Sequence, residues 1–558
     1  MSLLKNFFVA QALWAILHAV CVLLSYAPFG FWPLGFVSVF AVLMAARRLR
    51  AQNLRRLLAT WLFFAIATSL ITFGWLVATV HTYTGERVVL TAALTLLYAL
   101  LFQTKFLLFF LFYRYLISGE MRIITALASA AVLAVSDAIS PELFPWCWGN
   151  TLGAETHLRQ LASVGSVYLV SFTAALGAAI AIVAIENPAE TPLRLRMKSA
   201  MPVLAVFAVL TLTAIAIRHI GAARQGQSLA VLAVQTNIGV AAETRRSDTQ
   251  FATDAINRLF NQSLEGLLLF GRVNLIVWGE GAMPFHSAQP IGSDRQIYSP
   301  TFDAVIEYLH RQSGAAVIYQ DLHYEEDRLH SRLTARPAAG DKTEYLKRRL
   351  VPWGEYLPLE SAIPAMRRLF PEAGKLSTGK ADGEITARYA DQLIERPSRA
   401  QLLADTALLS SPEKIRSLPM RQIAAQTLVV KPVLCYEALF PSESRTESAD
   451  LIVNLASDAW FGDGIEGQHH AHATTMRAVE NGVPMVRAAV SGVSLITDLY
   501  GDDIRPRTGQ GRPELLYAEV ALNRRKTIFA RFGMLAFYAL MFVALWPFFL
   551  QRVVYSRK

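Results

Sequence analysis

The stretch Leu428-Val429-Val430-Lys431-Pro432-Val433-Leu434-Cys435-Tyr436-Glu437 joins a predicted buried strand to a candidate nucleophile. Its apolar run, 428–434, has the length and composition of a strand inside a layered α/β domain. Cys435 ends this run and is the only cysteine after Cys147. A lone thiol followed by an acidic residue indicates a nucleophile, whereas the commoner role of a free cysteine is packing in a core. The surrounding chain has to decide between these two roles.

Residues 228–523 have the pattern of an α/β layered domain built around this stretch. Short apolar runs alternate with amphipathic segments, so we expect catalytic groups at strand ends and in loops. The segment 374–426 is polar and poor in strand signal, which is typical of a long insertion or lid. The predicted strands are 229–235, 274–278, 315–319, 428–434, 451–455, 485–490 and 493–497, and the predicted helices are 246–269, 301–312, 399–409 and 467–481.

The rest of the chain has the composition of a membrane domain. Of the 558 residues, 53% are hydrophobic and only 17% are charged, and the first 220 contain apolar stretches long enough to cross a bilayer. We therefore expect a transmembrane domain at 1–220, the α/β domain at 228–523 and a C-terminal transmembrane helix at 528–550. The eight expected spans are 8–26, 30–46, 57–80, 88–116, 122–140, 163–185, 199–218 and 528–550.

The net charge of +10 is better explained by membrane orientation than by nucleic-acid binding, because many basic residues adjoin apolar segments. Arginines follow the second span at Arg47, Arg48 and Arg50, and further basic residues follow the fourth, sixth and eighth spans. The positive-inside bias then places both termini in the cytoplasm. The α/β domain lies on the other side, which in a bacterium is the periplasm.

Two ionisable residues fall within expected spans, Lys105 in the fourth and Asp137 near the end of the fifth. Charges inside a membrane often mark a functional site, but a structural ion pair or snorkelling to the interface explains them equally simply. The sequence leaves both interpretations open.

A histidine cluster raises the question of a metal. His469, His470 and His472 follow Asp458 and Asp463, but adjacent histidines on a helix point to different sides. The spacing is not the His-x-x-x-His that places two ligands on one face. We expect no metal and no other cofactor.

Three strand-end motifs supply the groups that a thiol nucleophile needs. Glu280 follows the apolar run 275–278, and Lys347 begins a motif that continues to Glu355. A thiol needs a base, and acyl transfer needs a donor for the developing oxyanion. We assign Glu280 as the base and Lys347 as the cation that favours the thiolate and holds the oxyanion. Glu355 and Glu437 are expected to neutralise and orient the lysine.

These motifs, in this order, resemble the Glu–Lys–Cys triad of the nitrilase (carbon–nitrogen hydrolase) superfamily. Within it, three runs resemble the bacterial apolipoprotein N-acyltransferase family, as does the layout of spans around one extracytoplasmic domain. The resemblance covers essentially the whole chain. The runs are Leu350-Val351-Pro352-Trp353-Gly354-Glu355-Tyr356-Leu357-Pro358, Asp458-Ala459-Trp460-Phe461-Gly462 and Tyr26-Ala27-Pro28-Phe29-Gly30-Phe31-Trp32-Pro33.

The resemblance implies an αββα sandwich carried on eight spans in the bacterial inner membrane, and a monomer. It implies transfer of an acyl chain from a phospholipid, typically phosphatidylethanolamine, to the N-terminal cysteine amine of a diacylated lipoprotein. Cys435 would be the nucleophile, Glu280 the base and Lys347 the oxyanion-stabilising cation, with Glu355 and Glu437 as supporting acids. Trp353, Tyr436 and Trp460 are the expected substrate-binding residues.

The chain also departs from the family pattern. Gly279 stands before the base where proline is usual, and Ser457 stands before the Asp-Ala-Trp-Phe run where asparagine is common. These departures suggest a divergent paralogue with a shifted substrate. Two alternatives remain: a membrane-tethered amidase that uses the same triad with water as acceptor, and a non-enzymatic membrane scaffold. The intact set of Glu280, Lys347 and Cys435 argues against the scaffold.

Overall fold

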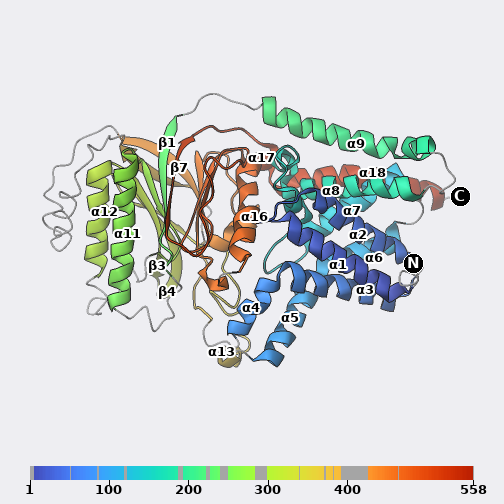
Figure 1. The fold of residues 1–558 in the computed structure, drawn as a ribbon, viewed down its shortest axis with the longest axis horizontal. Coiled ribbons are helices and arrows are strands. Elements are labelled where there is room, and N and C mark those ends of the chain that lie inside the picture. Colours follow the sequence, from blue (N-terminus) through green and yellow to red (C-terminus); the bar gives the residue numbers. More distant parts are fainter. Residues whose placement is uncertain are drawn as a thin grey trace. The chain divides into compact units, whose positions relative to one another are not determined.

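The computed structural model describes residues 6–50, 52–83, 87–117, 122–186, 193–220, 227–238, 249–282, 298–338, 340–369, 373–380, 383–390, 425–462 and 464–556. The chain divides into two compact units. The helical unit comprises residues 1–223, 464–482 and 526–558, and the sheet unit comprises residues 224–463 and 483–525. Figure 1 labels their elements.

The helical unit consists of apolar helices with little charge inside them. Proline at the start of α2 and asparagine caps before α1 and α3 fix where these helices begin. Within the described ranges its α-helices are α1 (Phe7–Ser25), α2 (Pro33–Arg48), α3 (Leu54–Ala67), α4 (Gly74–Tyr83), α5 (Val88–Phe102), α6 (Thr104–Leu116), α7 (Ile123–Ile139), α8 (Ala162–Glu186), α9 (Leu193–Ile220), α16 (Glu466–Asn481), α17 (Ile528–Phe532) and α18 (Met534–Ser556).

Five helical segments among the described residues are long and apolar enough to cross a membrane, and a bent pair, α5 with α6, makes a sixth. α2 and α7 occupy two more of the eight expected spans, but they have only 16 and 17 residues. At 1.5 Å per residue they reach less than the roughly 30 Å hydrocarbon core. The expected span at 528–550 is interrupted at Gly533, where φ is 58°, and continues as α18.

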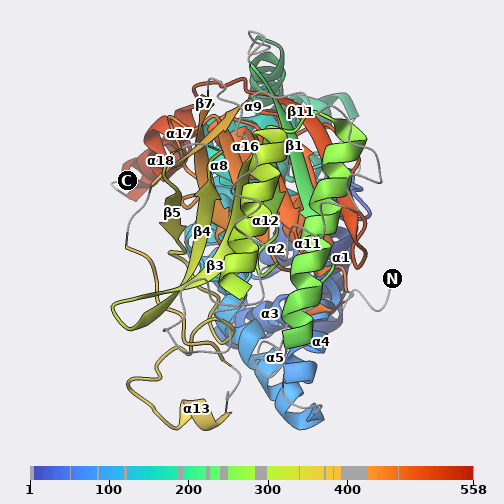
Figure 2. The ribbon, with the colours of Figure 1, turned by 90° about the vertical axis from the view of Figure 1, so that its left-hand side faces the viewer.

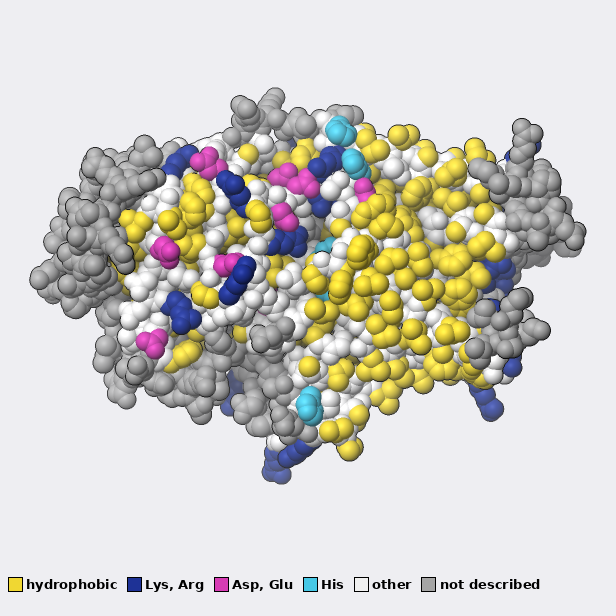
Figure 3. Space-filling model, viewed as in Figure 1, with side chains coloured by type: hydrophobic (Ala, Val, Ile, Leu, Met, Phe, Trp, Pro, Cys, Tyr) yellow, Lys and Arg dark blue, Asp and Glu magenta, His cyan; other side chains and the backbone are white. Residues whose placement is uncertain are grey.

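Large apolar side chains remain exposed on these helices. Val89, Val543 and Leu535 are among them, with exposed fractions of 84%, 67% and 74%. Figure 3 shows hydrophobic side chains gathered over the helices of this unit on the face in view. Such a surface is typical of helices that face lipid. The chain is therefore a membrane protein with several candidate spans.

The two intramembrane charges form a buried structural pair. Lys105 Nζ lies 2.7 Å from Asp137 Oδ1 and 2.5 Å from Glu142 Oε1, and the lysine and aspartate side chains are fully buried. Asp137 also accepts hydrogen bonds from the Trp148 backbone N–H and the Ser171 hydroxyl. These partners satisfy charges that would otherwise be costly in an apolar setting. The structure therefore shows the expected ion pair, and the full burial of both side chains excludes snorkelling to the interface.

The sheet unit contains two sheets. The six-stranded sheet has the order β11-β1-β2-β3-β4-β5 and the five-stranded sheet the order β10-β9-β8-β7-β6. β1, β2 and β3 run parallel, as do β7, β8 and β9. The strands are β1 (Ser228–Gln235), β2 (Leu275–Trp278), β3 (Ala316–Glu325), β4 (Arg328–Arg336), β5 (Thr343–Leu346), β6 (Ile385–Ala390), β7 (Ala425–Leu434), β8 (Leu451–Ala456), β9 (Met485–Ala489), β10 (Leu495–Thr497) and β11 (Glu514–Ala521).

The sheets pack face to face because their parallel strands are apolar on both sides. One core cluster takes side chains from both sheets, such as Val231 and Val277 from the first and Val430 and Val453 from the second. A second cluster lies between the six-stranded sheet and the helices α11 (Thr249–Phe270) and α12 (Tyr298–Ser313). Figure 2 shows these two helices side by side in front of the sheet. The unit thus has one helix layer and two sheet layers, which are three of the four layers of the expected αββα sandwich.

The predicted central strands and the helices near 246–269, 301–312 and 467–481 are confirmed. Four strands were missed: β4, β5, β6 and β11. The supposed insertion 374–426 contains one of them, β6, which pairs antiparallel with β7. These strands mix polar with apolar residues or are very short, so their sequences lack a clear strand signal. The predicted helix 399–409 lies outside the described residues.

Candidate active site

The candidate site lies where the carboxyl ends of strands from both sheets meet. Glu280 is the second residue after β2, Cys435 follows β7 directly, and Lys347 follows β5 directly. The Glu280 backbone N–H donates to the Ala456 carbonyl at the end of β8, 3.2 Å away. This bond joins the two sheets at the site. Parallel strands naturally bring such terminal residues to one edge.

Cys435 is held in an uncommon backbone conformation. It leaves β7 with φ of 44° and begins the short 3-10 helix Cys435–Leu439. Positive φ is unfavourable for a residue with a Cβ, and such strain is concentrated at functional sites. The side chain is buried, and its sulfur lies 3.9 Å from the Ser457 carbonyl oxygen. This sharp turn from strand into helix points the thiol toward the strand ends.

Glu280 is fixed by close packing of the backbone around it. A Cβ on Gly279 would lie 2.7 Å from the Val490 nitrogen, so only glycine fits at this approach of the two sheets. After the glutamate, Gly281 has φ of 73°, and its N–H donates to Gln320 Oε1 at 2.9 Å. The departure from proline at position 279 therefore has a structural reason in this chain.

Lys347 lies between two carboxylates. Its Nζ is 3.1 Å from Glu280 Oε1 and 2.7 Å from Glu355 Oε1, and the side chain is 1% exposed. Glu355 also accepts the Val351 backbone N–H through its other oxygen. Glu355 therefore links the lysine to the turn around residues 351–356. The structure brings together Glu280, Lys347 and Glu355, as the sequence predicted.

Glu437 has a different set of contacts from the one expected. It accepts the Leu434, Arg348 and Arg349 backbone N–H groups and the Tyr345 hydroxyl at 2.7 to 3.1 Å. No hydrogen bond between its carboxylate and Lys347 occurs within the described residues. Glu437 therefore ties the end of β7 to the segment that carries the lysine. Tyr345, for which the sequence predicts no role, helps it do so through its hydroxyl group.

Burial controls the protonation of the site. Burial raises the pKa of Glu280, and Lys347 opposes this rise. Burial alone would lower the pKa of Lys347, but the Glu280 and Glu355 carboxylates raise it well above its usual range. Burial, followed by the charge of Glu280, raises the pKa of the Cys435 thiol well above 9.0, although Lys347 lowers it. The resting site therefore holds a neutral thiol, and Lys347 does not by itself produce a thiolate.

The three expected substrate-binding residues have different settings. Tyr436 follows the nucleophile, is buried, and packs edge-on against Phe440. Trp353 lies half-buried in the turn that carries Glu355, with φ of 61°. Trp460 belongs to the short 3-10 helix Ala459–Phe461, and its side chain lies outside the described part of the structure. Asp463 also lies outside it.

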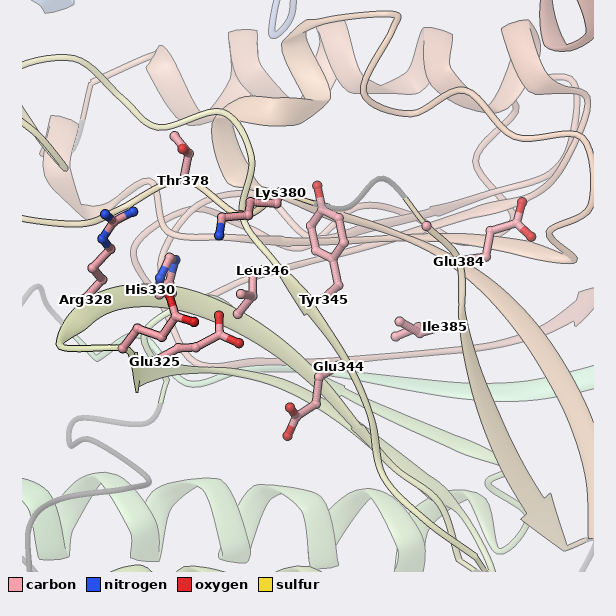
Figure 4. A pocket seen from close by; sticks show the side chains of 13 residues that line it. Glu325, Arg328, His330, Glu344, Tyr345, Leu346, Thr378, Lys380, Glu384 and Ile385 are labelled. Carbon is pink, nitrogen blue, oxygen red and sulfur yellow. The ribbon is translucent and has the colours of Figure 1, made fainter.

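A polar hollow of about 300 Å³ is lined in part by Glu344, Tyr345 and Leu346 of β5. Figure 4 shows Arg328 and His330 on the β3–β4 hairpin and Thr378 and Lys380 on the segment across from it. Acidic and basic side chains together line this hollow, so it does not have the apolar wall that an acyl chain requires.

We expect Gly279→Ala to destabilise the sheet unit and slow the reaction. The new methyl group would meet the Val490 backbone, which cannot move without disturbing both sheets. Overpacking of this kind costs about 1–3 kcal/mol. The measurements are the denaturant midpoint and the rate of Cys435 acylation. Gly383→Ala is the matched control, because a Cβ there would meet nothing within 4 Å; equal effects of both changes would contradict the packing argument.

Two family models match consecutive parts of the chain. The apolipoprotein N-acyltransferase N-terminal domain matches residues 18–180, and the carbon–nitrogen hydrolase model matches residues 233–528. The second match covers more than half of the chain and contains the whole Glu280, Lys347 and Cys435 set. The two models occur together in the order expected of a helical region followed by a catalytic domain.

Full-length relatives agree with these matches. The chain is 26% identical to apolipoprotein N-acyltransferase 1 of Leptospira interrogans, over 90% of this chain and 91% of that one. It is 27% identical to apolipoprotein N-acyltransferase of Pseudomonas putida, over 92% and 91% of the two chains. A carbon–nitrogen hydrolase crystal structure from Helicobacter pylori G27 matches 56% of this chain and 95% of its own, with 13% identity and a TM-score of 0.36. The chain belongs to the apolipoprotein N-acyltransferase family of enzymes, within the carbon–nitrogen hydrolase superfamily.

Proposed function

We propose that this enzyme transfers an acyl chain from a phospholipid, through a thioester on Cys435, to the N-terminal cysteine amine of a diacylated lipoprotein. The observation that carries the proposal is the ammonium group of Lys347 held between Glu280 and Glu355, at the strand ends where Cys435 leaves β7. Phosphatidylethanolamine is the expected donor. Membership of the family and the apolar helices support a lipid donor and a lipoprotein acceptor.

In the first half-reaction, the Cys435 sulfur attacks the ester carbonyl carbon while Glu280 takes the thiol proton. A C–S bond forms, and the carbonyl oxygen becomes an oxyanion that Lys347 stabilises. The ester C–O bond then breaks, and Glu280 returns the proton to the departing lysophospholipid oxygen. Because the resting thiol is neutral, proton transfer and attack are coupled.

In the second half-reaction, the lipoprotein amine attacks the thioester carbon. A C–N bond forms, the C–S bond breaks, and Glu280 carries a proton from the amine back to the sulfur. Exchange of a thioester for an amide is downhill, so the chain's own residues suffice without a cofactor or ATP. Glu355 and Glu437 serve as positioning residues, for Lys347 and for the segment that carries it.

We further propose the full membrane arrangement: eight spans, counting α2, α7 and the bent α5–α6 pair, in the bacterial inner membrane. Arg47, Arg48 and Arg50 then face the cytoplasm together with both termini, and the sheet unit faces the periplasm as part of a monomer. A membrane-impermeant maleimide tests this sidedness at Glu447→Cys, an exposed position of the sheet unit whose side chain is 61% accessible. Labelling in intact cells supports the arrangement, and labelling only after lysis contradicts it.

Product analysis tests the function. The purified protein is incubated with phosphatidylethanolamine and a synthetic diacylated lipopeptide, and the products are identified by mass spectrometry. The proposal predicts triacylated lipopeptide and lysophospholipid in equal amounts. Free fatty acid without triacylated lipopeptide would instead indicate a hydrolase that uses water as acceptor.

We expect the acid limb of the acylation rate to lie at a higher pH than it would with a glutamate of ordinary pKa as the base. Glu280 must be ionised to accept the thiol proton, and its pKa lies above the usual 4.5 because the carboxyl is buried. As the pH falls through this raised pKa, protonation removes the base and the rate is lost. Single-turnover acylation rates measured against pH, with circular dichroism at each pH as the folding control, test this. An acid limb at or below pH 4.5 would contradict it.

A further inference from the structure

A second carboxylate approaches the nucleophile from β8. Asp458 lies two residues beyond this strand, and one of its carboxylate oxygens is within 4.8 Å of the Cys435 sulfur. The side chain is fully buried. A Cβ on Gly492 would lie 1.7 Å from Asp458 Oδ2, so the glycine leaves the space that this carboxylate occupies. The reaction described above gives this charge no role.

A buried negative charge at this distance opposes the reaction. The sulfur gains negative charge during attack and again when it leaves the thioester, and a nearby anion makes both states less favourable. After burial and the charge of Glu280, and against the lowering effect of Lys347, Asp458 is a further cause that raises the pKa of the Cys435 thiol. An active enzyme therefore needs a group that neutralises Asp458.

Arg487 on β9 is that group. Its guanidinium donates to both Asp458 oxygens, at 2.9 and 2.7 Å, and the two side chains are 0% exposed. The remaining donors contact Asn454 Oδ1 at 2.6 Å and the Val493 carbonyl at 3.1 Å. A planar guanidinium bound in this way both cancels the carboxylate charge and fixes its direction.

The same network reaches the nucleophile through the backbone. Asn454 donates to the Val433 carbonyl on β7, two residues before Cys435, at 3.0 Å. Ser457, next to Asp458, provides the carbonyl that the thiol contacts. Arg487 therefore connects the ends of β7, β8 and β9 around the sulfur.

We propose that Arg487 is a positioning residue for the reaction: it neutralises Asp458 and turns its carboxylate so that negative charge can develop on the Cys435 sulfur. This role of Arg487 adds to the proposed function and rests on it for its biological meaning. It concerns only the reactivity of the thiol, however, so it can be tested without lipid.

The test measures the second-order rate of iodoacetamide reaction at Cys435, followed on its peptide by mass spectrometry, for folded protein at one pH. We expect Arg487→Met to slow alkylation about tenfold, because the uncompensated Asp458 charge, within 4.8 Å of the sulfur, then disfavours negative charge on the sulfur by this order or more. Asp458→Asn should react at least as fast as the unaltered protein. The alkylation rate of the double variant should recover to within about threefold of that of the unaltered protein, because the Asp458 charge that Arg487 neutralises is gone.

Arg332→Met is the matched control for lost stability. Arg332 is a buried arginine that binds both oxygens of Asp321 in the same unit, at 2.9 and 2.6 Å. The Arg332→Met variant should lower the denaturant midpoint as Arg487→Met does, without changing the alkylation rate of Cys435. Unchanged alkylation in Arg487→Met, or a double variant as slow as Arg487→Met, would overturn the inference.

If Arg487→Met does not fold, the alkylation rate of Asp458→Asn is compared with those of the unaltered protein and of the double variant, and a double variant much slower than Asp458→Asn would contradict the inference. Slower alkylation in Asp458→Asn than in the unaltered protein would contradict the role given to its charge. Failure of acyl transfer with this alkylation pattern intact would count against the proposed function alone, because iodoacetamide requires neither donor nor acceptor.

Discussion

Cys435→Ala is expected to abolish the acyl-enzyme. Incubated with labelled phosphatidylethanolamine, the unaltered protein should acquire a label that hydroxylamine removes, because hydroxylamine cleaves thioesters. The alanine variant should lose this label, and its transfer rate should fall at least about 10⁴-fold, since no other atom takes over from a missing nucleophile. The change deletes one buried sulfur, so the fold should persist.

The control for this result is Cys21→Ala. Cys21 is also a buried free cysteine, but it lies on α1 of the helical unit. Its replacement should leave both the label intensity and the transfer rate within about twofold of those of the unaltered protein, because the change is small and far from Cys435 in the sequence. A label of equal intensity in the Cys435→Ala protein would mean that another group carries the acyl chain.

Lys347→Met is expected to have the next largest effect. The substitution keeps most of the side-chain volume but removes the cation between Glu280 and Glu355, whose carboxylates then lie unpaired in a buried site. Loss of one oxyanion-stabilising donor costs about 10²–10³-fold in rate. Loss of one partner of a buried ion pair also lowers stability, by about 3–5 kcal/mol.

The two effects separate when rate and stability are measured together. Lys342→Met provides the control. Lys342 directly precedes β5, the strand that Lys347 follows, but its side chain is 50% exposed and pairs with Glu344. We expect this control to leave the acylation rate and the denaturant midpoint nearly unchanged. If the Lys347→Met protein is unstable but is acylated at the normal rate, the lysine has no role in the chemistry.

The central strands could be predicted from the sequence because burial on both faces demands continuous apolar runs. The runs at 275–278 and 451–455 show this, and the corresponding strands end two residues before Glu280 and Asp458. β11 could not be predicted in this way. It closes the six-stranded sheet by pairing with β1, almost 300 residues earlier, and no local pattern encodes such a partner.

The site was predictable to the extent that its groups follow strands. Glu280 and Cys435 follow predicted strands, whereas Lys347 follows β5, a strand that the sequence did not predict, so its family motif alone identifies it. The role of Glu437 was not predictable, because it depends on backbone N–H groups of a segment about 90 residues away. The pairing of Arg487 with Asp458 was not predictable either, because their contact joins neighbouring strands through the interior.

The protonation state of the thiol also needed the structure. The sequence placed a lysine near the cysteine, which by itself predicts a thiolate. Burial outweighs that lysine, and Glu280 adds to the effect, so the pKa of the thiol lies well above its usual range. In the proposed mechanism the base is therefore required for acylation itself, and we expect that Lys347 does not rescue the loss of Glu280.

The most direct test of acyl transfer is a chase of the isolated acyl-enzyme. The protein is acylated with labelled phosphatidylethanolamine, separated from free lipid, and mixed with a diacylated lipopeptide in a single turnover. Transfer through Cys435 predicts that the hydroxylamine-sensitive label leaves the protein and appears in the lipopeptide as a hydroxylamine-resistant amide, at a rate no slower than steady-state turnover. Label that stays on the protein, or that appears only as free fatty acid, would contradict it.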